Sequence, residues 1–449
     1  MSLLAALSLL AAAPAIVPRD CPPPLAAAHA RCGTLEVPED RARPEGRKIA
    51  LNLIIIPATG PVRLPPLFDL EGGPGLPSTH SAGFYLTDGA AYRAGRDVVL
   101  VDQRGTGGSN PLSCPELDAR ERQYVPLYPD ALVEACRNRL AAQADLTRYG
   151  TDEAAADLDA VRTALGAERI DLVALSYGTT LALRYATLHP EQVRAMVLFG
   201  TVPPEARPPR GHAPAATHAF GLIVRDCAAA PACRQAYPEL GRELSRATAR
   251  LPAILSREVF VEKLRNLMYA PDRAARIPQI IHRAAAGDFA PFYAATRRGG
   301  PAELADGLYL SITCAESMAG MDYRTATRAS MQTPFGNYRL FVQNEACRHW
   351  PIFAPAPDFF VPPAPTMSVL FVSGERDPVS PPEWAEAIAR RSPRARHLVL
   401  PGGGHVLDGM EGVDTCLDPL IVRFLDNAEA GQLDTSCVAT MHPPAFVTE

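Results

Sequence analysis

Residues 170–180 read Ile-Asp-Leu-Val-Ala-Leu-Ser-Tyr-Gly-Thr-Thr, an apolar run that stops at Ser176 and leads into the helix-forming residues 181–186. The pattern predicts a strand, a sharp turn and a helix. In a nucleophile elbow a serine occupies such a turn, and small residues two positions before and after it let strand and helix approach. Ala174 and Gly178 hold those two positions here. A chance Ser-Tyr-Gly turn has the same letters, so the interpretation depends on the surrounding sequence.

The surrounding sequence predicts a parallel sheet covered by helices. An amphipathic helix from 151 to 166 precedes the elbow, and an apolar strand at 193–199 follows it. Further strands are expected at 367–373 and 396–400, with a helix at 382–390 between them. Strands that alternate with helices are typical of a parallel sheet. We also expect opening strands at 32–38, 48–57, 65–70 and 96–101, and a closing helix at 417–427.

We expect a mainly helical cap to be inserted into this α/β core. Between about residues 202 and 365, prolines and glycines interrupt short helical stretches, and the alternation of strands and helices stops. The expected organisation has four parts: a signal peptide at 1–15, the first part of the core at 16–202, the cap at 203–365 and the second part of the core at 366–449.

The N-terminus and the cysteines indicate export. The apolar run at 3–17 is shorter than the roughly 20 residues that span a membrane. Ala13-Pro14-Ala15 suits signal cleavage after Ala15, although no Lys or Arg precedes the apolar run. The chain has ten cysteines and no Cys-x-x-Cys pair, and disulfides persist mainly in oxidising compartments. We therefore expect a periplasmic or secreted protein with disulfide bonds.

The cysteine spacings suggest local pairing in sequence order, although sequence does not fix connectivity. The suggested pairs are Cys21 with Cys32, Cys114 with Cys136, Cys227 with Cys233, Cys314 with Cys347 and Cys416 with Cys437.

Charge and motif content argue against several classes of partner. The 449-residue chain has a net charge of -5 and a pI near 6.1, so it offers no basic field for nucleic acid. No His-Glu-x-x-His or similar metal spacing occurs. We expect no metal and no cofactor, and a monomer that acts on a peptide or a small acyl substrate. Surface or packing roles are the default for the other histidines, including His80, His212, His218, His282 and His349.

Two glycine-rich stretches follow predicted strands. In Glu71-Gly72-Gly73-Pro74-Gly75, backbone N–H groups could stabilise an anion, although an ordinary turn would look the same. The stretch 102–109 is followed by Asn-Pro instead of a helix, which excludes a dinucleotide-binding fingerprint. We expect Asp102 and Arg104 in that stretch to form a structural ion pair or a loop clamp.

A serine, an acid and a histidine follow predicted strands in an order that suits nucleophilic catalysis. Ser176, Asp377 and His405 fit this order. Serine needs a histidine to take its proton, and a buried carboxylate fixes the tautomer of that histidine. Glu375 is a rival for the acid, but Asp377 is preferred because Pro378 after it suits a turn.

These motifs resemble the α/β-hydrolase family of proline iminopeptidases and secreted tripeptidyl aminopeptidases. The resemblance rests on Gly72-Gly-Pro-Gly75, Asp102-Gln-Arg-Gly105, Leu175-Ser-Tyr-Gly-Thr179, Gly374-Glu-Arg-Asp-Pro378 and Gly402-Gly-Gly-His405. Cys-Gly-Thr-Leu-Glu-Val-Pro at 32–38 and the helix from Thr151 match the tripeptidyl branch more closely. Ala174 and Glu71 depart from the family pattern, which usually has glycine and often histidine there.

The resemblance implies an α/β-hydrolase fold and an oxyanion hole formed by the backbone N–H groups of Tyr177 and Gly73. It implies an exported serine hydrolase that releases N-terminal residues or short peptides through an acyl-enzyme. An esterase or amidase would use the same three residues under a different cap. A catalytically inactive binding protein is a third hypothesis, which the intact triad argues against.

An aminopeptidase needs a carboxylate in the cap to pair with the ammonium group of its substrate. Glu316 follows an apolar, helix-like run, and Glu345 lies just before Cys347. A bridge between Cys314 and Cys347 would bring the two glutamates near one another. We therefore expect Glu316 and Glu345 to bind the substrate, with solvated surface acids as the alternative.

Overall fold

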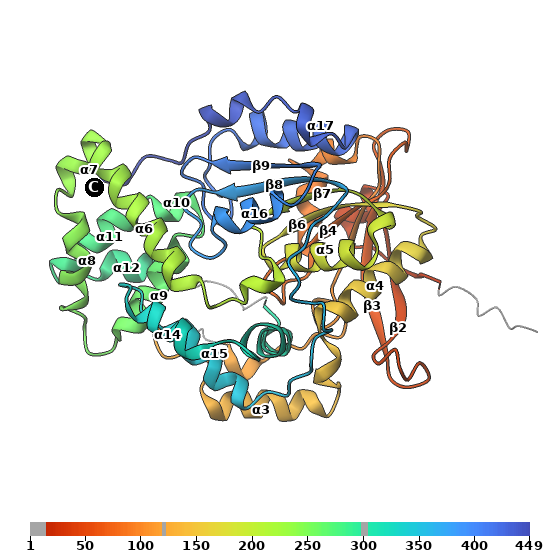
Figure 1. Ribbon diagram of the computed structural model, residues 1–449, viewed down its shortest axis with the longest axis horizontal. Coiled ribbons are helices and arrows are strands. Elements are labelled where there is room, and N and C mark those ends of the chain that lie inside the picture. Colours follow the sequence, from red (N-terminus) through yellow and green to blue (C-terminus); the bar gives the residue numbers. More distant parts are fainter. Residues whose placement is uncertain (1–14, 119–122, 298–303) are drawn as a thin grey trace, which may run out of the picture.

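The computed structural model describes residues 15–118, 123–297 and 304–449 (Figure 1). Within them, one sheet has the strand order β1-β2-β3-β5-β4-β6-β7-β8-β9. The strands are β1 (Val17–Arg19), β2 (Arg31–Pro38), β3 (Lys48–Ile56), β4 (Leu67–Leu70), β5 (Val98–Val101), β6 (Ile170–Leu175), β7 (Val193–Phe199), β8 (Ser368–Gly374) and β9 (Ala395–Leu400). The pairs β1·β2, β2·β3 and β3·β5 are antiparallel. From β5 onward along the sheet, every pair is parallel. The predicted fold class is confirmed. Apart from Ala15, the predicted signal peptide lies outside the described residues.

Helices cover both faces of the sheet. They include α4 (Thr151–Ala164), α5 (Tyr177–Leu188) and α16 (Pro382–Ala389) on one face and α17 (Asp418–Asn427) on the other (Figure 1). In β8, Val369 and Phe371 belong to the apolar cluster that contains residues of α5 and α16. Their neighbours Leu370 and Val372 belong to the cluster that contains α17. Burial on both faces explains why these strands read as unbroken apolar runs.

The chain between β7 and β8 is helical throughout its described elements. These helices are α6 (His212–Ala229), α7 (Pro231–Ala236), α8 (Leu240–Thr248), α9 (Arg257–Leu267), α10 (Pro271–Ala274), α11 (Ile277–Ala285), α12 (Ala290–Thr296), α13 (Asp306–Ile312), a π-helical turn (Thr313–Met318), α14 (Tyr323–Met331) and α15 (Tyr338–Arg348). Figure 1 shows α6 to α12, in green, gathered at one end of the sheet. A further helix, α3 (Asp130–Ala141), comes before the elbow in sequence but contacts α13 and α15.

All ten cysteines lie in the described residues and form the five pairs that their spacing suggested. Their Cα atoms are 5.1 to 5.8 Å apart. The Cys314–Cys347 bridge ties the π-helical turn to α15.

None of the helices in the described parts of the chain combines the length and the apolar character that crossing a membrane requires.

Candidate active site

Ser176 lies at the turn between β6 and α5, as the opening stretch predicted. Its φ of 55° and ψ of -124° place a non-glycine residue in a strained backbone conformation. A Cβ added to Gly178 would lie 2.1 Å from the carbonyl oxygen of Leu70, so the close approach of helix and strand requires glycine there. Ala174 is fully buried, and its methyl group is accommodated in β6. The local fold thus lifts the serine above the end of the sheet.

Asp377 and His405 follow the neighbouring strands β8 and β9. One carboxylate oxygen of Asp377 accepts from the backbone N–H groups of Val379 and Ser380 at 2.8 and 2.9 Å. The other oxygen lies 2.7 Å from Nδ1 of His405. This contact places the proton of a neutral imidazole on Nδ1 and leaves Nε2 as the base. His405 and Ser176 line the same cavity.

Ser380 also contacts this pair, although no sequence motif marked it. Its hydroxyl donates to Asp377 Oδ2 at 2.7 Å and lies 3.1 Å from Nδ1 of His405. The rival acid Glu375 has other partners, since its carboxylate bonds Arg225 at 3.2 Å and the Gly402 N–H at 2.9 Å. Of the two acids considered, Asp377 is therefore the one whose carboxylate bonds the histidine.

The glycine loop after β4 (Leu67–Leu70) packs directly against Ser176. A Cβ at Gly72 would lie 2.9 Å from the Cβ of Ser176, and Gly73 has a φ of 110°, which favours glycine. Tyr177 is the first residue of α5, so its N–H has no acceptor within the helix. Backbone donors on both sides of a serine can stabilise negative charge that develops on a carbonyl oxygen.

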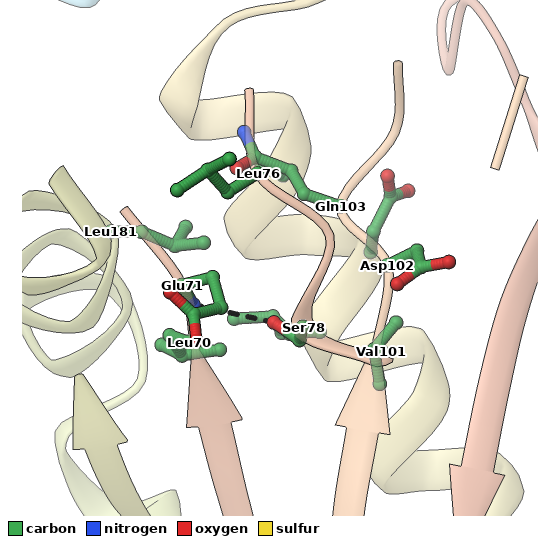
Figure 2. A pocket seen from close by; sticks show the side chains of 11 residues that line it. Leu70, Glu71, Leu76, Ser78, Val101, Asp102, Gln103 and Leu181 are labelled. Carbon is green, nitrogen blue, oxygen red and sulfur yellow. Dashed lines mark hydrogen bonds between the residues drawn. The ribbon is translucent and has the colours of Figure 1, made fainter. Parts of the chain in front are cut away.

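Glu71 braces the glycine loop. Its N–H donates to the Ser78 hydroxyl at 3.3 Å, which Figure 2 marks, and its carboxylate accepts from Ser81 at 2.7 Å. The pocket in Figure 2 has a volume of only about 10 Å³, no more than a single water needs. We therefore assign this region a supporting role for the loop.

Asp102 and Arg104 hold loops in place through separate partners. Asp102 accepts from the Asn52 side chain at 2.7 Å and from the Gly108 N–H at 2.9 Å. Arg104 Nε donates to Asp157 at 2.6 Å. These contacts agree with the expected loop clamp, whereas no ion pair joins Asp102 to Arg104 in the described parts of the chain.

Glu316 lies on the π-helical turn, is 5 % exposed and lines the cavity that contains Ser176. Its two carboxylate oxygens accept from the N–H and the hydroxyl of Thr151 at 2.7 and 2.5 Å. The Thr151 hydroxyl lies 2.9 Å from the hydroxyl of Tyr177. Burial raises the pKa of Glu316 to about 7, although the hydrogen bonds from Thr151 lower it. A buried acid is thus connected to the residue that follows the serine.

Glu345 does not join Glu316 at this cavity. It lies on α15, where its carboxylate bonds Arg348 at 3.0 Å and Asn344 at 3.2 Å, and it is absent from the described residues that line the cavity. The expected disulfide is present, but the side chain of Glu345 pairs with the arginine one helical turn further on. We therefore give Glu345 no part in substrate binding.

One cavity of about 1110 Å³ is lined by Gly72, Gly73, Ser176, Tyr177, Glu316 and His405. Polar residues that no sequence motif marked also line it: His212, Arg265, Arg273, Asp306 and Arg339 from the helical segment between β7 and β8, and Asp408 from the loop after β9. Tyr128, from the segment before the elbow, lines it as well. From the sequence we expect a surface or packing role for His212, whereas the structure places this residue in the lining of the cavity. Its position depends on how the helices between β7 and β8 pack, which no local sequence motif indicates.

Comparisons with known proteins agree with this architecture. A family model described as alpha/beta hydrolase fold matches residues 65–407. The tripeptidyl aminopeptidase of Streptomyces lividans is 26% identical over 459 residues, which cover 92% of this chain and 84% of that protein. Serine protease Hip1 of Mycobacterium tuberculosis is 34% identical over 223 residues, 45% of this chain and 42% of that protein. Carboxylesterase B of Mycobacterium tuberculosis is 28% identical over 442 residues, 86% of this chain and 83% of that protein.

These matches confirm the resemblance that the motifs indicated. The family match includes β4 to β9 and every strand end that bears a proposed catalytic group. The chain therefore belongs to the α/β-hydrolase fold family, and it is a serine hydrolase of that fold.

Proposed function

We propose that this protein is an exported aminopeptidase that cleaves short peptides near their N-termini through an acyl-enzyme. Ser176 attacks the carbonyl carbon while His405 takes its proton, and Asp377 stabilises the imidazolium that forms. The N–H groups of Gly73 and Tyr177 bind the oxyanion, each contributing about 3 kcal/mol in the transition state. His405 then gives the proton to the leaving amine, and a water molecule hydrolyses the acyl-enzyme in the second half of the reaction.

The observation that carries the peptidase assignment is the buried carboxylate of Glu316 in the same cavity as Ser176. Two hydrogen bonds link it through Thr151 to Tyr177. A substrate ammonium group that pairs with Glu316 would favour its charged form and compensate for its burial. This pairing would select peptides with a free N-terminus and place them beside the serine.

The similarity to a tripeptidyl aminopeptidase over 92% of the chain supports the same substrate class. We also propose that residues 203–365 form the cap that limits the substrate to short peptides. The five disulfides support export to the periplasm or the medium, because such bonds are rare in the cytosol.

An esterase acting on small acyl substrates is the second candidate. The similarity to carboxylesterase B over 86% of the chain favours it, at an identity close to that of the aminopeptidase relative. Both activities would use the same triad. The two candidates differ in whether the substrate needs an ammonium group.

The test compares three substrates at matched concentration: a peptide with a free N-terminus, its N-acetylated form and a small acyl ester. The aminopeptidase cleaves the free peptide, and the variant Glu316→Gln raises KM for it about tenfold to hundredfold, as expected when a buried charged pair is lost. The same variant changes ester hydrolysis far less. If the wild type cleaves the acetylated peptide efficiently, or if the variant loses equal activity on the peptide and the ester, the aminopeptidase proposal is wrong and the esterase takes its place.

A further inference from the structure

Three basic side chains from different cap helices meet at the active-site cavity. His212 begins α6, Arg265 lies near the end of α9 and Arg339 lies in the first turn of α15. All three line the cavity that contains Ser176. None of them takes part in the mechanism proposed above.

The two guanidinium groups share one buried carboxylate. Arg265 donates to both oxygens of Glu262, at 2.9 and 2.7 Å, while Arg339 lies 3.7 Å from one of them. Arg339 is held further by Tyr309, whose hydroxyl accepts from it at 2.6 Å. Glu262 can balance only one of the two positive charges, so these three residues together keep a net positive charge.

The ring of His212 supplies the observation that indicates a ligand. His212 is 8 % exposed, and no group in the described parts of the chain bonds either ring nitrogen. Arg339 Nε is also buried without an acceptor among these residues. Burial, and then the charges of Arg265 and Arg339, lower the pKa of His212 well below its ordinary value. The neutral ring offers one donor and one acceptor to whatever enters the cavity.

This basic group is connected to the catalytic histidine through Tyr269. The rings of Tyr269 and His405 have centroids 5.1 Å apart, and the Tyr269 hydroxyl accepts from Arg265 at 3.1 Å. Because the catalytic histidine protonates the leaving amine, the part of the peptide beyond the scissile bond lies beside it. The basic group is therefore placed to meet the leaving part of the substrate.

We propose that His212, Arg265 and Arg339 form a subsite for a carboxylate of the substrate, namely the free C-terminus of a short leaving peptide or amino acid. The proposal rests on the proposed peptidase function and adds a second charged requirement to it. Glu316 selects the ammonium end of the substrate, and the basic group selects its carboxylate end. Asp306 and Asp408 also line the cavity, so the subsite acts through the placement of unused donors and not through the overall charge.

The experiment uses alanine peptides of three to five residues, each as the free acid and as the C-terminal amide. Released fragments are measured by mass spectrometry. We expect kcat/KM to be at least tenfold higher for the free acid, as charge-assisted hydrogen bonds imply. In the variants His212→Leu and Arg339→Gln, the ratio of acid to amide should fall to about one. Arg328→Gln, which removes an exposed arginine on α14, is the matched control and should keep the wild-type ratio.

A binding measurement makes the test independent of turnover and of misfolding. Calorimetry on folded Ser176→Ala protein should show at least tenfold tighter binding of the acid than of the amide, and adding His212→Leu should remove the difference. Equal affinities would overturn the subsite, even if both peptides are cleaved and the aminopeptidase stands. If no peptide is cleaved but esters are, the proposed function fails, and the calorimetry still decides the subsite. The same peptides with Asp or Asn as the leaving residue separate a side-chain carboxylate from the terminal one: a preference for Asp over Asn, without a preference for the free terminus, would overturn the C-terminal assignment.

Discussion

Replacing Glu316 with glutamine should remove part of the pH dependence of the free energy of unfolding. Burial is the main reason that the pKa of Glu316 rises from 4.5 to about 7; the hydrogen bonds from Thr151 oppose the rise, Asp152 adds to it and Arg184 opposes it. The folded protein therefore holds this proton more tightly than the unfolded chain does. The resulting stabilisation is complete below about pH 4.5 and is lost as the pH rises through 7.

The size of the effect follows from that change in pKa. A pKa higher by about 2.5 corresponds to about 3 kcal/mol once the group is charged in both states. Glutamine has nearly the same shape, and its amide oxygen can accept from the Thr151 N–H while its NH₂ group donates to the Thr151 hydroxyl. The variant should therefore fold with the same contacts and without the titration.

The assay is urea unfolding of both proteins at pH 5 and pH 8.5, with disulfides intact and ionic strength matched. From pH 5 to pH 8.5, the free energy of unfolding of the wild type should fall by up to about 3 kcal/mol more than that of Glu316→Gln. Burial also raises the pKa of Asp69 to about 7, but this residue is present in both proteins and cancels in the difference. Equal pH dependence in the two proteins would refute the reasoning.

Three further predictions test the elbow and the triad. Ser176→Ala should abolish turnover and fluorophosphonate labelling without changing the melting temperature; retained labelling would exclude this serine as the nucleophile. Asp377→Asn should lower kcat by several orders of magnitude, because it spoils the histidine tautomer, whereas Glu375→Gln should have little effect; the reverse order in steady-state kinetics would reassign the acid. Gly178→Ala should destabilise the protein by about 1 to 3 kcal/mol, because the added Cβ would lie 2.1 Å from the carbonyl oxygen of Leu70; an unchanged melting temperature would contradict this.

The core and the placement of Ser176, Asp377 and His405 were predictable because their determinants are local in the sequence. The apolar run before Ser176 and Gly178 after it specify the strand, the turn and the helix within eleven residues. Asp377 and His405 follow strands of the same parallel sheet, and the ends of parallel strands meet at one edge. Their proximity therefore required only the chain order and the class of sheet.

The helical segment between β7 and β8 could not be predicted to the same depth because its determinants are tertiary. Glu316 was a predicted site residue and lines the cavity, but it does so from a π-helical turn, which no sequence pattern predicted. Glu345 lies close to a disulfide that ties its helix to that turn, yet its side chain pairs with Arg348 instead of facing the cavity. His212 has no motif around it, and it reaches the cavity because α6 packs there.

The contacts of Glu316 couple substrate selection to catalysis in the proposed mechanism. The carboxylate that would bind the ammonium group also holds Thr151, whose hydroxyl meets Tyr177, the residue that would supply an oxyanion donor. Hydrogen bonds to a charged acceptor are stronger than those to a neutral one. A bound ammonium group that keeps Glu316 charged would therefore tighten its bonds to Thr151 and support the turn that carries the nucleophile. An acetylated peptide or an ester brings no such charge, so the cap would favour free N-termini in the reaction step as well as in binding.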